Sequence, residues 1–136
     1  MKKFKSLFVL CFVSLALLFT SCKNENTPEA VTEKFVTLIQ QGKVTQAKEL
    51  CDGKTKSILN MVEGMIEEGL QKAKSEGKKF EGITILSSEI DGDTAVVKYR
   101  NNGKGADSEK ESSLNLKKID DVWKVSINKE GANKEN

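Results

Sequence analysis

The chain contains no histidine. Near neutral pH, histidine is the side chain that most often acts as a general base, activates a nucleophile or binds a metal. Its absence excludes a Ser-His-Asp triad, a Cys-His dyad and zinc sites built from His and Cys. We therefore expect no metal and no cofactor, and the sequence assigns no residue a catalytic role.

Cysteine is scarce as well, with three in the chain: Cys11, Cys22 and Cys51. Cys11 lies inside an apolar N-terminal run and Cys22 directly follows it. Cys51 is then left without an internal partner, so no disulfide is expected in the domain. We interpret Cys51 as a small apolar residue at a helix end. The alternative, a reactive thiol, lacks a histidine to activate it.

The first 21 residues contain no acidic side chain and have the layout of a secretory leader. Lys2, Lys3 and Lys5 form a basic head, and the apolar run Leu7 to Phe19 follows. That run has 13 residues, whereas a helix needs roughly 20 to cross a bilayer. Residues 1–21 are therefore predicted to be a signal peptide.

The end of the leader, Leu18-Phe19-Thr20-Ser21-Cys22, resembles the lipobox of bacterial lipoproteins. Phe19 stands where that motif usually has leucine. The resemblance implies that Cys22 is acylated and becomes the first residue of the mature protein, held on a membrane of the cell envelope outside the cytoplasm. The alternatives are an ordinary secretory signal with an incidental cysteine, or an uncleaved anchor.

The excess of positive charge belongs to the leader. Without its three lysines, the 22 basic residues of the chain become 19, against 20 acidic ones. The mature protein thus has no net attraction to nucleic acid, and no nucleic-acid partner is expected. Residues 22–26 are predicted to be the lipidated cysteine and a polar linker that does not pack, 27–130 a single domain, and 131–136 a polar tail.

The first half of the domain has helical periodicity. Thr27-Pro28-Glu29 is a helix start, because threonine caps, proline fits the first turn and glutamate suits the positive end of the dipole. Three helices are predicted over Pro28–Gln41, Lys43–Cys51 and Thr55–Ser75. The third has a broad apolar face made of Ile58, Met61, Val62, Met65, Ile66, Leu70 and Ala73.

The second half alternates as strands do, over Ile83–Ile90, Thr94–Arg100, Glu109–Ile119 and Val122–Lys129. Ala95, Val97 and Tyr99, then Leu114 and Leu116, then Trp123, Val125 and Ile127, are expected to point inward. Helices followed by antiparallel strands predict an α+β fold, with the N-terminal helices packed on one face of the sheet.

Three stretches carry a family resemblance: TPEAVTEKFVTLIQQGKVTQAKEL, EIDGDTAVVKYR and LKKIDDVWKVS. They resemble bacterial lipoproteins with a domain of unknown function (DUF4878), a group near lumazine-binding-like domains. The family is similar to the nuclear transport factor 2-like (NTF2-like) or cystatin-like fold, in which a curved sheet wraps a long helix and forms a cone that can hold a ligand. Related cone-shaped folds include ketosteroid isomerases and dehydratases.

Four residues are candidates for lining a pocket: Met61, Met65, Tyr99 and Trp123. Packing in the core is the default reading for all four, and contact with an apolar ligand is the alternative. An isomerase-like role for Tyr99 would require a facing carboxylate whose pKa is raised by burial.

The carboxylates themselves have simpler explanations. Asp91, Asp93, Asp120 and Asp121 fall in predicted turns, where aspartate is expected for backbone reasons. The long-helix acids Glu63, Glu67 and Glu68 are read as part of its solvated face.

The sequence thus favours a membrane-tethered, noncatalytic module that binds a small apolar ligand or an envelope protein. An alternative is a small isomerase-like or hydrolase-like enzyme that uses a carboxylate and Tyr99. A structural accessory of an envelope complex is a third reading.

Overall fold

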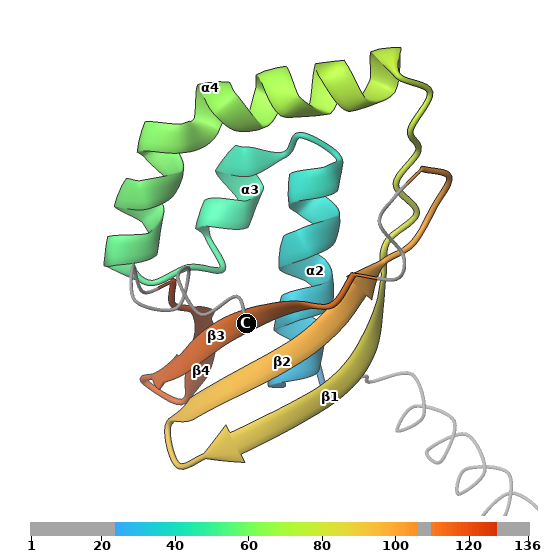
Figure 1. Ribbon diagram of the computed structural model, residues 1–136. Helices are drawn as coiled ribbons and strands as arrows, with labels where there is room; N and C mark the ends of the chain where they lie inside the picture. The colour runs from blue at the N-terminus through green and yellow to red at the C-terminus, as the bar shows by residue number, and fades with distance from the viewer. Residues whose placement is uncertain (1–23, 106–109, 128–136) are drawn as a thin grey trace, which may run out of the picture.

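The computed structural model of the chain describes residues 24–105 and 110–127 (Figure 1). Helices come first and an antiparallel sheet follows, as predicted. The elements are α2 (Pro28–Gln40), α3 (Val44–Lys48), α4 (Gly53–Ser75), β1 (Ile83–Asp91), β2 (Thr94–Asn101), β3 (Ser112–Ile119) and β4 (Val122–Val125).

Side-chain caps start the two longer helices. The Thr27 hydroxyl accepts a hydrogen bond from the Ala30 N–H, and Pro28 occupies the first turn of α2. Asp52 caps α4 by accepting from the Thr55 N–H at 2.8 Å. This cap starts α4 two residues earlier than the apolar periodicity indicated.

The four strands form one antiparallel sheet in the order β1-β2-β3-β4. Gly92, with φ of 59°, makes the turn between β1 and β2. Asp120 and Asp121 turn the chain between β3 and β4, both with positive φ (51° and 63°). The prediction of turn positions for these aspartates is confirmed. The last strand ends at Val125. The predicted extension to Lys129 is wrong for residues 126 and 127, which are described and lie outside any strand, and residues 128 and 129 lie outside the described residues.

A β-bulge interrupts β1 between Ile85 and Ser87. Ile85 pairs with Tyr99 before the bulge, and Ser88 pairs with Val97 after it. The extra residue reverses which alternate side chains face inward, and bulges also bend a strand. The bulge lies in the strand whose curve is plain in Figure 1.

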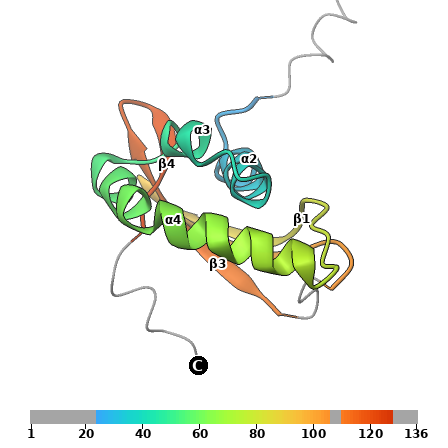
Figure 2. The same cartoon turned by 90° about the horizontal axis from the view of Figure 1, so that it is seen from above.

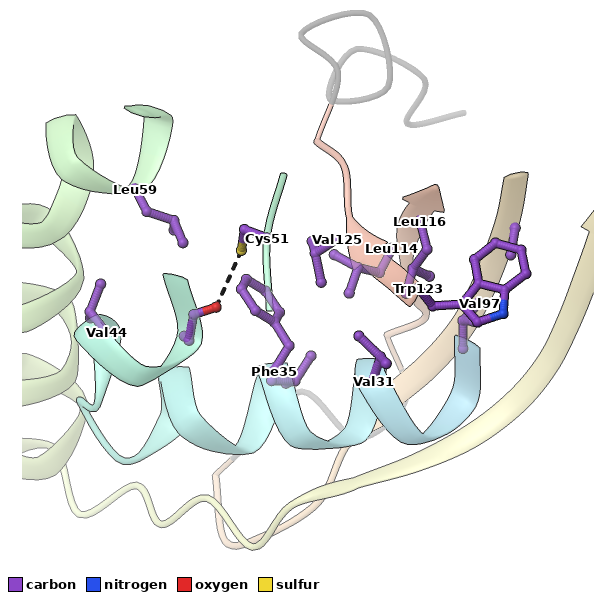
Figure 3. Packing of buried hydrophobic residues seen from close by; sticks show 13 residues of the cluster. Val31, Phe35, Val44, Cys51, Leu59, Val97, Leu114, Leu116, Trp123 and Val125 are labelled. Atoms are coloured by element: carbon purple, nitrogen blue, oxygen red, sulfur yellow. Dashed lines mark hydrogen bonds between the residues drawn. The ribbon is translucent and has the colours of Figure 1, made fainter. Parts of the chain in front are cut away.

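The core lies between α2 and the sheet face that carries Val97 and Leu116 (Figure 3). The inward positions predicted for β2, β3 and β4 are confirmed, since their residues form this core. Its buried members are Val31, Phe35, Val36, Val44, Ala47, Cys51, Leu59, Ala95, Val97, Leu114, Leu116, Trp123 and Val125. Side chains of α2 therefore occupy the concave side of the sheet.

Helix α4 lies across the top of the molecule in Figure 1, and the view from above in Figure 2 shows it passing beside α2 and α3 and over β3. Its buried residues are Thr55 and Leu59, and Val62 and Ile66 continue the same stripe half-buried. The prediction that Met61 and Met65 pack in the core is wrong, because they are 84 % and 71 % exposed. At roughly 100° per residue they lie to one side of the stripe that meets the core.

Candidate functional site

A large open pocket lies beside the N-terminal segment. We call it the tether groove; it has a volume of about 860 Å³ and is lined by residues 24–26, α2, Leu50 and β4. Its apolar lining comprises Ala30, Val31, Leu38, Leu50, Val122 and Trp123, and its polar lining Asn24, Glu25, Asn26, Glu33, Lys34, Thr37 and Lys124. Opposite charges are thus mixed around an apolar centre.

Asn26 joins the N-terminal segment to the edge of the sheet. Its side-chain amide donates to the Asp121 carbonyl at 2.7 Å, and its side-chain oxygen accepts from the Trp123 N–H at 2.9 Å. These two bonds imitate a neighbouring strand and satisfy part of the open edge of β4. The expectation that residues 23–26 do not pack is therefore wrong for Asn26, whose side chain fits the backbone of β4.

Further along β4, residues 50–52 cover the same edge. The Val125 N–H donates to the Leu50 carbonyl at 2.8 Å, and the Asp52 N–H donates to the Val125 carbonyl at 3.0 Å. Two segments far apart in sequence thus hold β4 in place. The groove wall that β4 provides is consequently tied to the fold at both ends of the strand.

Trp123 is the candidate pocket residue that lies in this wall. Its side chain is 6 % exposed and belongs to the core cluster. The Lys118 ammonium lies 5.7 Å from the centre of its ring, within the range of a cation–π contact. Most of the ring is therefore packed, and the remainder borders the groove.

A second pocket, which we call the lysine pocket, has a volume of about 470 Å³. It lies between the end of α2, the C-terminal half of α4 and residues 78–80. Lys74, Lys78 and Lys79 line it together with Glu67. Neither Met61, Met65 nor Tyr99 lines this pocket or the tether groove.

Tyr99 has no acidic partner among the described residues. It is half-buried against the core, and burial raises the pKa of its phenol while a hydrogen bond with the Ser112 side chain lowers it. None of the described carboxylates is buried. Half-buried Glu63 pairs with Lys48 at 2.7 Å. The described residues thus do not supply the buried acid that an isomerase-like mechanism with Tyr99 requires.

Asp52 is also unsuited to act as a general acid. Partial burial raises its pKa, but hydrogen bonds from the Thr55 and Ser126 hydroxyls and the Thr55 N–H, with the charge of Lys117, outweigh that effect. The pKa of Asp52 is consequently lowered, and its carboxylate stays ionised as the cap of α4.

Cys51 is the small buried residue that its sequence context predicted. It is 2 % exposed, and its thiol donates to the Ala47 carbonyl at 3.3 Å, the dashed line in Figure 3. Burial raises the pKa of the thiol to about 12, helped by the charge of Asp52 and opposed by Lys56 and Lys124. A thiol in this state is a poor nucleophile, because the thiolate is the reactive form.

We expect Cys51 to react with a disulfide reagent about a thousandfold more slowly in the folded protein than in the unfolded chain at pH 8. The reason is the rise of its pKa from 9.0 to about 12, which lowers the thiolate fraction. A chain that begins at Asn24 has Cys51 as its single thiol, so colour release by Ellman's reagent with and without denaturant measures the ratio. Because deprotonation favours the unfolded state, stability should also fall above about pH 9. Fast stoichiometric labelling of the folded protein would contradict this account.

Among the described residues, no group of three or more His, Cys, Asp or Glu side chains is arranged to hold a metal ion. In the same part of the chain, no helix combines the length and apolar character needed to cross a membrane. The predicted signal peptide, Cys22 and the polar tail lie outside the described residues.

The arrangement of helices on a curved antiparallel sheet has counterparts among solved structures. A Campylobacter jejuni protein provisionally assigned as an NTF2-like transpeptidase matches with a TM-score of 0.60 and 18 % sequence identity, over 75 % of this chain and 99 % of that protein. The chain therefore has an NTF2-like α+β fold. No curated protein matches it.

The family follows from the sequence match. The model of the domain of unknown function DUF4878 matches residues 20–126, most of the chain. The protein belongs to the DUF4878 family, and the resemblance of its sequence motifs to that domain is confirmed.

Sequence reasoning anticipated one wall of the tether groove, through Trp123, and missed the others. Leu38 and Leu50 are apolar helix-region residues whose pattern indicates burial but not a shared groove. The position of Asn26 gave little indication of its contact with β4, because an asparagine just before a helix is also explained as a helix cap. Lys78 and Lys79 follow α4 and read in sequence as a helix end.

Proposed function

We propose that this protein is a lipoprotein of the bacterial cell envelope, anchored to a membrane by lipid on Cys22, and that it works as a noncatalytic binding module. Its tether groove holds a small, mainly apolar molecule. The observation that carries the proposal is the groove itself, a site of about 860 Å³ formed partly by the segment that leads to Cys22.

The position of the groove supports a role at the membrane surface. Asn24 lines the groove and lies two residues after Cys22. A residue spans at most about 3.6 Å of extended chain, so the Cα atom of Cys22, whose side chain would carry the acyl group, lies within about 7 Å of the Cα atom of Asn24. A lipid anchor at that position would keep the groove near the membrane, where apolar molecules concentrate.

The lining of the groove supports binding rather than chemistry. Ligand sites commonly have volumes of about 300–1,000 Å³, an apolar lining and a few polar groups that orient the ligand. The side chains of Leu38, Leu50 and Val122 supply the apolar part, and Lys34 and Glu33 are polar groups at the same site.

The transpeptidase assignment of the Campylobacter jejuni protein does not change this proposal. At 18 % identity the likeness concerns the fold. A cysteine nucleophile would need an accessible, activated thiol, whereas Cys51 is buried with a raised pKa.

The single tryptophan offers a direct readout of the groove. A chain that begins at Asn24 is titrated with a brominated fatty acid, and quenching of Trp123 fluorescence is followed. Replacing Ala30, a groove residue, by phenylalanine should fill the site. The apparent affinity for the brominated fatty acid, obtained from the quenching curve, should then fall at least tenfold. Met61→Phe places the same ring on the exposed side of α4 and should leave the affinity unchanged.

Two results would contradict a binding role for the groove. One is the absence of saturable quenching in the unmodified chain. The other is equal quenching in the Ala30→Phe and Met61→Phe variants, which would indicate that the fatty acid binds elsewhere. Circular dichroism of both variants verifies that they are folded as the unmodified chain is.

A further inference from the structure

The lysine pocket lies at the C-terminal end of α2, where Gln40, Gln41 and Gly42 line it, whereas the tether groove is lined by α2 residues from Ala30 to Leu38. The two pockets have no lining residue in common. Leu70, Ala73 and Phe80 supply apolar surface to the lysine pocket, and Gln41 and Gln71 supply amides. It is therefore a separate candidate site with its own chemistry.

The charge of the lysine pocket is predominantly positive. Three lysines line it, and among the described residues Glu67 is the single acidic lining residue. Two of the lysines have weak partners outside the pocket: Lys78 lies 3.5 Å from Glu76 and Lys79 lies 3.9 Å from Glu81. All four of these side chains are well exposed, and exposed pairs of this kind contribute little.

Lys74 has no ion pair within the described ranges 24–105 and 110–127. Its ammonium group, with those of Lys78 and Lys79, is available to an anion that enters the pocket. A ligand anion would then replace exposed, weak contacts by charge-assisted hydrogen bonds, which are the stronger kind.

The backbone that carries Lys78 and Lys79 is held in place. The Lys79 N–H donates to the Lys104 carbonyl at 2.7 Å, and the Glu81 N–H donates to the Asn102 carbonyl at 2.8 Å. Gly103 permits this approach, because a Cβ at that position would clash with the Lys79 carbonyl oxygen.

The Gln40 side chain ties the same segment to α2. Its amide nitrogen donates to the Gly82 carbonyl at 3.2 Å and to the Asn101 side-chain oxygen at 3.0 Å, and its oxygen accepts from the Gly82 N–H at 3.1 Å. One pocket residue thus joins α2, the start of β1 and the end of β2. Because the end of α2 and residues 79–82 are fixed relative to one another, a ligand would not have to order this part of the wall, which favours affinity.

We propose that the lysine pocket binds a small amphipathic anion, a phosphate or carboxylate group on a short apolar chain. The anionic group contacts Lys74, Lys78 and Lys79, and the chain packs on Leu70 and Phe80. This site goes beyond the tether groove and does not depend on it.

A structural role for these lysines is the competing explanation. Basic side chains near a helix C-terminus interact favourably with the helix dipole, and Lys72 and Lys74 both lie in the last turn of α4. Lys72 does not line the pocket. Substitution of Lys74 should therefore weaken anion binding if the lysine pocket is a ligand site, whereas substitution of Lys72 should affect only the interaction with the helix dipole.

The test uses the full chain in nanodiscs of a zwitterionic lipid, titrated by calorimetry with hexyl phosphate. Saturable binding with one site per chain is expected. The double variant Lys74→Gln/Lys78→Gln should weaken it at least tenfold, whereas Lys72→Gln should change it less than twofold. Hexanoate should bind as well, and hexanol should not.

The source of the anion is distinguished by a second arm, in which the nanodiscs contain phosphatidic acid. If the headgroup occupies the pocket, hexyl phosphate binding should fall in these discs; if the natural anion is a free molecule, it should not. Either outcome retains the anion site.

The proposal is overturned if hexyl phosphate does not bind, or if the double variant binds it as well as Lys72→Gln does. Neither result bears on Trp123 quenching, so the tether groove stands or fails separately.

Discussion

Replacement of Cys22 by alanine is expected to release the protein from membranes completely. The expectation follows from the leader and the lipobox-like residues 18–22. Each buried methylene contributes about 0.8 kcal/mol to membrane binding, so several acyl chains on one residue hold firmly and their loss leaves nothing comparable. The measurement is the distribution of the protein between washed membranes and the aqueous fraction.

Cys11→Ala is the matched control for this experiment. It removes a cysteine from the predicted leader, so the mature protein should be identical and its membrane attachment unchanged. Labelling of cells with an alkyne fatty acid should mark the unmodified protein and Cys11→Ala, and should not mark Cys22→Ala. A mature protein that begins at another residue, or that has no added acyl mass, would contradict the lipoprotein proposal.

The fold was predictable where local chemistry and burial agree. Thr27-Pro28 starts α2 as its side chains predict, and Asp91-Gly92-Asp93 makes the turn between β1 and β2. In β2, Ala95 and Val97 point inward because strict alternation leaves them no other face. In each of these cases a short stretch of sequence was enough to predict the local structure.

The errors arose where packing decides between patterns that look alike in sequence. The apolar periodicity of α4 includes Met61 and Met65. In the structure, however, the core contacts the side of the helix that carries Leu59 and Val62, and the two methionines are exposed. The bulge in β1, which reverses the inward side of the strand after Ile85, is a feature that the sequence did not predict, because no residue type in that stretch marks it.

The candidate sites were less predictable than the fold, because residues distant in sequence assemble them. Asn26 and Trp123 meet across 97 positions, and Gln40 meets Gly82 across 42. Composition and spacing along the chain do not encode such pairs. Trp123 was identified because an aromatic residue on an inward strand position is a candidate pocket residue in any fold.

Helix α2 contributes lining residues to both candidate pockets. Val31 lines the tether groove, Gln40 lines the lysine pocket, and Phe35 lies between them in the buried cluster. A disturbance of the α2 core is therefore expected to affect both pockets.

The substitution Phe35→Ala tests that dependence and has the largest expected effect on stability. Phe35 is 6 % exposed and packs between α2 and the sheet, where its ring is seen in Figure 3. Truncation of a buried phenylalanine costs about 3–5 kcal/mol, through lost burial and the cavity that remains. Because domains of this size are stable by only about 5–15 kcal/mol, the variant should be close to unfolding at room temperature.

Met61→Ala is the matched control, since it also truncates a large apolar residue within a helix. Met61 is 84 % exposed, so its loss should change the free energy of unfolding by less than about 0.5 kcal/mol. Urea unfolding of both variants, followed by circular dichroism and Trp123 fluorescence, gives the two values. Equal losses would mean that α4 buries Met61 against the core, contrary to its position here. A loss confined to Phe35→Ala would indicate that α2, rather than the outer side of α4, holds the sheet and both pockets together.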